Sequence, residues 1–344
     1  MINNIRRRVP LPVLNFIHMK KYFASILAAV VLVFMSMPVY AAKKNKWTAK
    51  DVPLAEPTAT YMFAHRDTCD LFLDYYKATP GSATEIDGKK KPAIIFSFGG
   101  GFVSGNRDKP HYQQWIKQLN DNGYPVFSID YRLGLKGQSV KGVKMIGAIK
   151  HSIYIGVEDL YSATDYILKH ADEFGIQPDN LVISGSSAGA IIALQAEYNL
   201  CNGYAPSSML PSDFRYAGVI SFSGAIFSTH GKVKYASAPA PQLLLHGTAD
   251  RVVTYKSIRV FNLGLFGSSK IAHRLDKKGY PYTIVRYVDH THDIADLMYY
   301  TVPEQLRFLE ESVIKKTGRS SDIILDDPAL PVDNTLRTLG DLYK

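Results

Sequence analysis

The sequence predicts an α/β fold, with a mainly parallel twisted sheet and helices on both of its faces. Short apolar runs suited to buried strands alternate with helical patterns from Ala93 to Lys316. Two of these runs end in glycine-rich turns, at 98–102 and 185–189. Because open α/β sheets bind ligands at the carboxyl ends of their strands, the two turns mark one candidate site.

Residues 1–42 have the pattern of a secretory signal peptide. Five basic residues precede an apolar run at 22–37, and small residues allow cleavage after Ala41 or Ala42. Met19 is an alternative start. A retained membrane anchor is the other interpretation, but the apolar run is shorter than the ~20 residues that a spanning helix needs. We therefore expect an exported protein, periplasmic or secreted.

The remainder divides into a Lys- and Pro-containing linker at 43–60, one domain at 61–316 and a polar extension at 317–344. The extension is expected to be a surface strap or disordered. The chain of 344 residues is long enough for one large core. No internal repeat is visible, and no long insertion interrupts the alternation of strands and helices.

The charge balance predicts no nucleic-acid partner. The whole chain has 40 basic and 31 acidic residues, but residues after 42 have 35 and 31, a net charge of +4. After signal cleavage we also expect no membrane partner, and the oligomeric state is not determined by the sequence. Cys69 and Cys201 can form a disulfide in an oxidising compartment, although two separate buried thiols are the favoured state.

The first half of the domain begins with an alternating segment, Cys69–Tyr76, which predicts an amphipathic strand at an antiparallel edge. Ala93–Phe98 is almost continuously apolar, as in a central parallel strand. His111–Asn122 presents one apolar face and ends before Gly123, which predicts a capped helix. Pro125–Asp130 is the next expected strand.

The second half repeats the pattern. Val157–Phe174 has apolar residues at helical spacing and ends at Gly175. The remaining expected strands are 181–183, 216–222, 242–246 and 282–288, and the remaining expected helices are 190–199, 253–263 and 294–316. Residues 132–152 and 201–215 are expected to be irregular, and residues 132–152 and 226–238 are expected to shape a shallow site.

Ser187 is the candidate nucleophile. It is the centre of Gly185-Ser186-Ser187-Ala188-Gly189, between an apolar strand and a helical run. Gly185 and Gly189 lack the Cβ atoms that would clash in so tight a turn. The motif alone also fits an ordinary Gly/Ser loop. The assignment therefore depends on its position between a strand and a helix, and on the candidate acid and base that follow later in the chain.

Candidate partners follow in the order acid, then base. Asp250 comes just after the strand that ends at His246, and we expect His246 to brace this loop as a structural residue. Two histidines compete for the base, and His292 is favoured over His290 because it adjoins the last helix. A metal site formed by these histidines with Asp289 and Asp293 is the disfavoured alternative, since further ligands at short spacing are absent.

The candidate oxyanion donors are the backbone N–H groups of Gly100, Gly101 and Ala188. The glycines follow a strand, and Ala188 lies at the expected N-terminus of a helix. A phosphate-binding loop is excluded, because no Lys-Ser/Thr follows the glycines and no Gly-x-Gly-x-x-Gly opens a helix. No metal or other cofactor is expected.

Five segments in this order resemble the esterases of the α/β-hydrolase superfamily. They are Phe98–Phe102, which is similar to a His-Gly-Gly-Gly element, Asp130-Tyr131-Arg132-Leu133, the approach to Ser187 from Phe174, His246–Asp250, and His292. The resemblance spans about residues 60–315 and is nearest to carboxylesterases and to bacterial esterases that trim carbohydrate esters. Phe98 replaces the usual His, and Ala190 stands where relatives of the hormone-sensitive-lipase type commonly have a third Gly.

The resemblance implies a serine esterase with the triad Ser187, Asp250 and His292, acting on a small-molecule or carbohydrate ester. Only 62 residues separate Ser187 from Asp250, too few for a large lid domain, so short acyl groups such as acetyl are expected, with feruloyl esters as another possibility. The alternatives are a serine peptidase of the same fold and a non-catalytic binding protein on a hydrolase scaffold.

Overall fold

The computed structural model describes residues 52–138, 143–328, 330 and 332. The predicted signal peptide at 1–42 lies outside the described residues, as does the first half of the predicted linker at 43–60, residues 43–51. The end of that linker is already structured, because strand β1 begins at Ala59. The irregular segment predicted at 132–152 is described except for residues 139–142.

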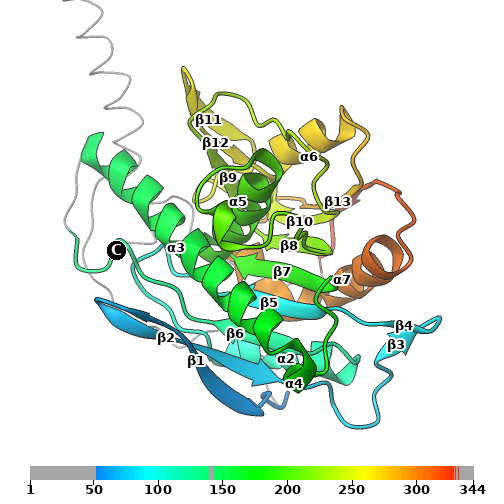
Figure 1. The fold of residues 1–344 in the computed structure, drawn as a ribbon. Coiled ribbons are helices and arrows are strands. Elements are labelled where there is room, and N and C mark those ends of the chain that lie inside the picture. Colours follow the sequence, from blue (N-terminus) through cyan, green and yellow to red (C-terminus); the bar gives the residue numbers. More distant parts are fainter. Residues whose placement is uncertain (1–51, 139–142, 329, 331, 333–344) are drawn as a thin grey trace, which may run out of the picture.

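A nine-stranded sheet forms the centre of the molecule, in the order β1-β2-β6-β5-β7-β8-β10-β13-β14 (Figure 1). The strands are β1 Ala59–Arg66, β2 Cys69–Tyr76, β5 Ala93–Ser97, β6 Val126–Ile129, β7 Leu181–Ser186, β8 Gly218–Phe222, β10 Gln242–Gly247, β13 Tyr282–Tyr287 and β14 Ser321–Leu325. All neighbours from β6 to β14 pair in parallel, whereas β2 is antiparallel to both β1 and β6. The predicted antiparallel edge is thus confirmed.

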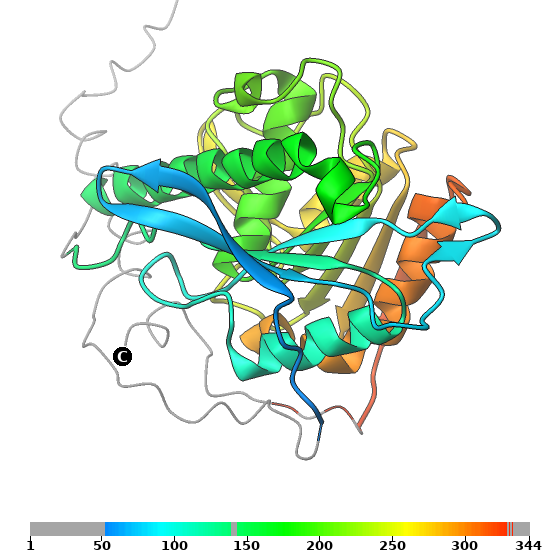
Figure 2. The same cartoon turned by 60° about the horizontal axis from the view of Figure 1, so that its bottom comes forward.

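Helices cover both faces of this sheet, as predicted. Figures 1 and 2 show α3 and α5 on one face, with α2 and α7 on the other. The helices are α2 Pro110–Asp121, α3 Val143–Lys169, α4 Ala171–Phe174, α5 Ala188–Asn202, α6 Ser268–Asp276 and α7 Val302–Phe308, with a short 3-10 turn at Ser207–Met209. Among the described residues, no helix has both the length and the apolar character needed to cross a membrane.

The core lies between the sheet and these two helical layers. Strand β5, Ala93–Ser97, is fully buried, as expected of a central parallel strand. Helix α5 is buried around nearly its whole circumference, which explains its weak sequence periodicity. Helix α5, which follows Ser187, is therefore enclosed by the core. By contrast, α2 is amphipathic and buries Tyr112, Trp115 and Leu119 on one face.

The prediction of a helix at 253–263 is wrong. Ser257–Val260 and Leu263–Gly267 instead form a hairpin, β11 and β12, which pairs with β9, Ala225–Ser228. β-branched and aromatic residues are frequent in this segment and favour strands. Phe261 adopts a positive φ of 54° in the two-residue turn, a conformation that fits a hairpin and not a helix.

The long helix predicted at 294–316 is interrupted. It consists of 3-10 turns at His292–Ala295 and Leu297–Thr301, then α7, then a π-helical turn at Leu309–Ile314. Pro303, near the start of α7, lacks the N–H that a continuous helix would need there. The extension predicted as a strap or disordered contributes β14, which pairs in parallel with β13. The sheet therefore continues beyond the predicted boundary at residue 316.

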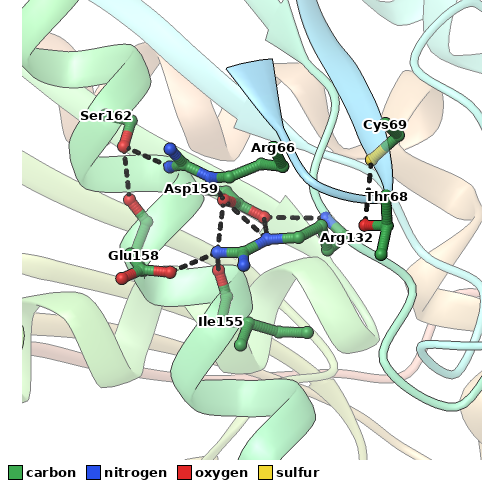
Figure 3. A network of polar contacts seen from close by, with 8 residues as sticks. All are labelled: Arg66, Thr68, Cys69, Arg132, Ile155, Glu158, Asp159 and Ser162. Atoms are coloured by element: carbon green, nitrogen blue, oxygen red, sulfur yellow. Dashed lines mark hydrogen bonds and ion pairs between the residues drawn. The ribbon is translucent and has the colours of Figure 1, made fainter. Parts of the chain in front are cut away.

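A charged network fastens the segment after β6 to helix α3 (Figure 3). Asp159 has a fully buried carboxylate, which accepts hydrogen bonds from Arg132 Nε at 2.9 Å and from Arg66 Nε at 3.1 Å. Arg132 also contacts Glu158, and Arg66 donates to Ser162 at 2.7 Å. Because a carboxylate without partners is costly to bury, this network fixes Arg132 of the Asp-Tyr-Arg-Leu motif.

The two cysteines are separate thiols, as the sequence favoured over a disulfide. Cys201 is buried within α5 and lies 3.3 Å from the Glu197 carboxyl group. Cys69, which we expected to be buried, is exposed at the start of β2. This part of the prediction is wrong because Cys69 lies at the turn end of the β1–β2 hairpin, where the first two residues of β2 are exposed.

Candidate active site

Ser187 stands on a sharp turn between β7 and α5. Its backbone has a φ of 52° and a ψ of −114°, a conformation that costs a non-glycine residue about 1–3 kcal/mol. A Cβ atom on Gly185 would lie 2.2 Å from the carbonyl carbon of Gly189, and one on Gly189 would lie 2.0 Å from the Ser97 oxygen. Both flanking glycines are therefore required, as the sequence motif predicts.

The structure brings Ser187, His292 and Asp250 into one hydrogen-bonded line. Nε2 of His292 lies 2.8 Å from the Ser187 hydroxyl, and its Nδ1 lies 2.8 Å from a carboxylate oxygen of Asp250. A carboxylate oxygen only accepts, so Nδ1 carries the proton and donates it. Nε2 is then free of a proton and accepts the hydrogen bond from the Ser187 hydroxyl.

Asp250 is fixed on both of its oxygens. One oxygen accepts the backbone N–H groups of Val252 and Val253 at 2.8 and 3.1 Å, and the other faces both His292 and His246. His246 is held in turn by the Ser268 hydroxyl at 2.8 Å and by the Val253 carbonyl at 3.0 Å. The prediction that His246 braces this loop is confirmed.

His290 does not reach Ser187. Its Nδ1 faces the Asp293 carboxylate at 2.8 Å, and its backbone carbonyl accepts the N–H of Ala249 at 3.0 Å. A Cβ atom on Gly247 would lie 2.3 Å from that carbonyl, so the His290 backbone rests directly on the end of β10. Of the two histidines that the sequence left in competition, the structure thus places His292 beside Ser187.

The glycine-rich segment at 99–101, here called the glycine loop, lies against the turn at Ser187. A Cβ atom on Gly99 would lie 3.3 Å from the Ser187 Cβ, and Gly100 and Gly101 have φ values of 145° and 63°. The loop is closed by the Gly100 carbonyl, which accepts two backbone N–H groups at 3.1 Å. The backbone bonds of α5 begin with the Ile191 N–H donating to the Ser187 carbonyl, so the Ala188 N–H stands outside the helical ladder.

Comparison with solved structures identifies the fold. Esterase 2 from Thermogutta terrifontis superposes with a TM-score of 0.54 and 22% identity, over 78% of this chain and 96% of that one. The chain has the α/β-hydrolase fold. A family model described as BD-FAE matches residues 83–226, the part that holds the glycine loop and Ser187.

Curated proteins of similar sequence belong to the esterase and lipase group. Carboxylic ester hydrolase LipN of Mycobacterium tuberculosis is 33% identical over 134 residues, which is 36% of this chain and 30% of LipN. Lipase 2 of a Moraxella species is 25% identical over 228 residues, 63% of this chain and 47% of that lipase. The α/β hydrolase described here thus aligns with less than half the length of these two relatives.

Phe98 and Tyr131 support the glycine loop, a role that the sequence did not reveal. The Tyr131 hydroxyl donates to the Phe98 carbonyl at 2.9 Å, and the two rings stack with centroids 4.4 Å apart. Tyr131 belongs to the Asp-Tyr-Arg-Leu motif, which was the available signal. In this α/β hydrolase, a phenylalanine that stacks on a tyrosine thus occupies the place of the usual histidine.

A cavity of about 540 Å³ opens beside the glycine loop. Its lining includes Phe98 and Gly105, together with Arg132, Lys136 and His151 from the two ends of the predicted 132–152 segment. None of Ser187, Asp250 and His292 lines this cavity, and neither do residues 226–238, so the expectation that 132–152 and 226–238 shape the site stays a prediction.

Opposing charges set the ionisation of the triad. Burial disfavours the imidazolium form of His292, but the Asp250 carboxylate outweighs burial and raises the pKa of His292 above its ordinary value. Burial likewise disfavours the Asp250 carboxylate, yet the facing His292 and His246 hold its pKa well below the usual range. Asp250 is thus an anion that stabilises positive charge on His292.

No group of three or more His, Cys, Asp or Glu side chains is arranged to hold a metal ion within the residues that the structure describes. His290 pairs with Asp293, whereas His292 faces Ser187 and Asp250, and the Asp289 N–H donates to the Thr248 hydroxyl. The four residues weighed for a metal site thus have different partners and do not converge on one metal-binding centre.

We expect the pKa of His292, measured by NMR titration of its imidazole protons, to exceed 6.5, its ordinary value. Asp250→Asn removes the carboxylate that stabilises the imidazolium, so the pKa should fall in this variant. Asp165→Asn, at an exposed pair with Lys169, is the matched control and should leave the pKa unchanged. A pKa of His292 that does not respond to Asp250→Asn would contradict this electrostatic account.

Proposed function

We propose that this protein hydrolyses carboxylic esters through an acyl-enzyme on Ser187. The observation that carries the proposal is the continuous hydrogen-bonded line from the Ser187 hydroxyl through His292 to Asp250. The relatives named carboxylic ester hydrolase and lipase support it, as does the fold shared with a thermophilic esterase. A serine hydroxyl is a weak nucleophile by itself, and an adjacent unprotonated imidazole is what activates it.

In the proposed reaction, the Ser187 oxygen attacks the ester carbonyl while its proton moves to Nε2 of His292. Negative charge forms on the carbonyl oxygen, where we assign the N–H groups of Gly100, Gly101 and Ala188 as donors. The intermediate then breaks its bond to the leaving alcohol, which takes the proton back from His292. Asp250 holds the imidazole in the required tautomer and stabilises its positive charge. No cofactor is part of this scheme.

The acyl-enzyme is released by the same groups in reverse roles. His292 removes a proton from water, the resulting hydroxide attacks the acyl carbon, and the proton returns to the Ser187 oxygen as its bond to the acyl group breaks. The products are a carboxylic acid and an alcohol, so water is the only co-reactant. At low pH the activity should fall as His292 becomes protonated, because the protonated imidazole cannot accept the serine proton.

Ser187→Ala should lower kcat for p-nitrophenyl acetate by about 10⁵–10⁶-fold, because it removes the nucleophile. His292→Ala should be similarly damaging, whereas His290→Ala should have a much smaller effect. The two histidines make a matched pair, since both are buried and lie two residues apart. Steady-state kinetics of the purified folded variants measure these effects. Full activity in Ser187→Ala would exclude the acyl-enzyme, and a greater loss in His290→Ala would overturn the choice of base.

We propose that the substrates have short acyl groups and that carbohydrate esters are among them. Residues 188–249 are occupied by α5, β8, β9, β10 and their connections, which leaves no inserted lid domain to bury a long acyl chain. Arg132, Lys136 and His151 in the adjacent cavity supply nitrogen donors that suit the hydroxyl groups of a sugar.

Accordingly, kcat/KM should fall from acetyl to octanoyl p-nitrophenyl esters, and acetylated xylan or feruloylated oligosaccharides should be cleaved. The assay follows released p-nitrophenol for the acyl series and released acetate or ferulate for the carbohydrate esters. A rate that rises with acyl length would contradict the short-acyl proposal. Inactivity on every carbohydrate ester, with p-nitrophenyl acetate cleaved, would contradict the carbohydrate proposal alone.

Export is also a proposal, supported by the basic and apolar pattern of residues 1–42. The protein recovered from its native cells should begin at Ala42 or Lys43, which N-terminal sequencing will show. The matched control is the same chain with the apolar run at 22–37 interrupted by lysines, which should remain unprocessed. Recovery of a cytoplasmic protein that begins at Met1 or Met19 would refute export.

A further inference from the structure

The net positive charge after residue 42 is concentrated in residues 226–278. This stretch has nine Lys and Arg residues against two Asp, a net charge of +7. Residues 43–344 together have 35 basic and 31 acidic residues, so the rest of them has 26 and 29, a net charge of −3. One of the two aspartates, Asp250, is buried. The outer surface of this stretch is therefore more basic than the count alone indicates.

The exposed cations of this stretch lie on elements that are neighbours in space. Figure 1 shows β9, the β11–β12 hairpin and α6 beside one another at one end of the molecule, and the three strands pair in one small sheet. Six exposed side chains from these elements and their connections form what we call the basic surface: Lys232, Lys234, Arg251, Lys256, Arg259 and Lys270.

Backbone contacts bring the loop after β9 against the hairpin. The Gly231 N–H donates to the Asn262 carbonyl at 2.7 Å. A Cβ atom on Gly231 would lie 3.9 Å from Nη2 of Arg259. Because Lys232 directly follows Gly231, two cations of the basic surface are neighbours although their segments are distant in sequence.

The other end of the hairpin lies against α6 and the proposed site. The Lys256 carbonyl accepts the Gly267 N–H at 2.9 Å, and α6 begins at the next residue. Lys256 thus adjoins the helical turn that contains Lys270. Arg251 directly follows Asp250 of the proposed site. The basic surface therefore extends from the hairpin to the loop that holds Asp250.

The protein does not neutralise these cations internally. Within the residues that the structure describes, none of the six side chains has a carboxylate oxygen within 4.0 Å. Elsewhere, by contrast, Arg107, Arg132 and Arg286 each pair with an aspartate. The neighbouring strand β12 offers β11 no acid, since the residues opposite β11 are Leu263, Gly264, Leu265 and Phe266.

Lys270 lies where a helix disfavours a cation. It is in the first turn of α6, which contains no acidic residue, although helix N-termini favour anions. Uncompensated cations on neighbouring elements also repel one another, which destabilises the free protein. Neither helix formation nor internal ion pairing thus accounts for the basic surface, whereas a bound polyanion would offset both penalties.

The distribution of the cations fits an extended ligand with many negative charges. They are spread over the loop after β9, the turn after β10, the hairpin and α6, so a ligand with one carboxylate would meet only some of them. A lipid bilayer also takes up apolar side chains, but the large apolar residues described as exposed at 226–278 are only Ile258 and Phe261. Among carbohydrates, the proposed class of substrate, a chain of uronate units has the required charge.

We propose that the basic surface binds polysaccharides that carry uronate groups and brings esters on these chains to Ser187. The choice of a carbohydrate as the ligand rests on the proposed function. Attraction between the cations and a polyuronate raises the local concentration of the chain and speeds its association. Because Arg251 adjoins Asp250, a chain bound along this surface reaches the edge of the proposed site.

Polygalacturonate without ester groups is the binding probe, because its binding requires no hydrolysis. Lys256→Glu/Lys270→Glu should weaken this binding about 10-fold or more, measured by isothermal titration calorimetry at an ionic strength of about 0.01 M. The variant should fold, since both side chains are exposed and an acid suits the first turn of α6. Lys232→Glu/Lys234→Glu, in a different loop, should act in the same direction.

Lys77→Glu/Lys144→Glu is the matched control. Both lysines are exposed, and they lie after β2 and on α3, outside the basic surface. The control changes the net charge by the same amount and should bind polygalacturonate like the wild type. Equal affinities in the control and in both variants of the basic surface would overturn the proposal. Binding of phosphatidylglycerol vesicles without binding of polygalacturonate would overturn it as well.

Activity gives a second readout. With O-acetylated polygalacturonate, Lys256→Glu/Lys270→Glu should raise KM about 10-fold or more and leave kcat unchanged, while kinetics with neutral p-nitrophenyl acetate stay as in the wild type. About 1 M NaCl should abolish the difference, because the Debye length is then about 3 Å. A protein that binds polygalacturonate through these lysines but cleaves no ester would refute the proposed function and support the binding surface.

Discussion

The arrangement of the site depends on a close approach of backbones that only glycine allows. Ser187 is held at a positive φ because β7 must turn into α5 within one residue, and Gly185 and Gly189 touch across that turn. Gly189 also lies against the Ser97 carbonyl at the end of β5. The Ser187 N–H is bonded to the Phe222 carbonyl of β8, so the strained residue is tied to the neighbouring strands. The surrounding core thus offsets a strain of about 1–3 kcal/mol.

Strand order then brings Asp250 and His292 together. β10 and β13 are adjacent parallel strands, with Gly247 opposite Tyr287, so Asp250 and His292 both follow strands that end at the same edge. Gly247 lets the 290–291 backbone rest on the end of β10. Two loops separated by about 40 residues in sequence therefore meet beside Ser187, which follows β7 at the same edge (Figure 1).

Burial makes the electrostatics of the triad strong. The Asp250 carboxylate has no free oxygen, because backbone N–H groups take one and two imidazoles take the other. In a site of low dielectric constant, this anion acts on His292 with little screening.

The sequence by itself determined the alternation of strands and helices, the sharp turn at Ser187 and the loop in which His246 braces Asp250, because glycine requirements and apolar runs are local properties. It did not determine the hairpin at 257–267 or strand β14, whose pairing partners lie elsewhere in the chain. Which of His292 and His290 lies beside Ser187 was decided only by tertiary structure. The answer depends on which loops the order of strands brings into contact, because two side chains in one loop then have different neighbours.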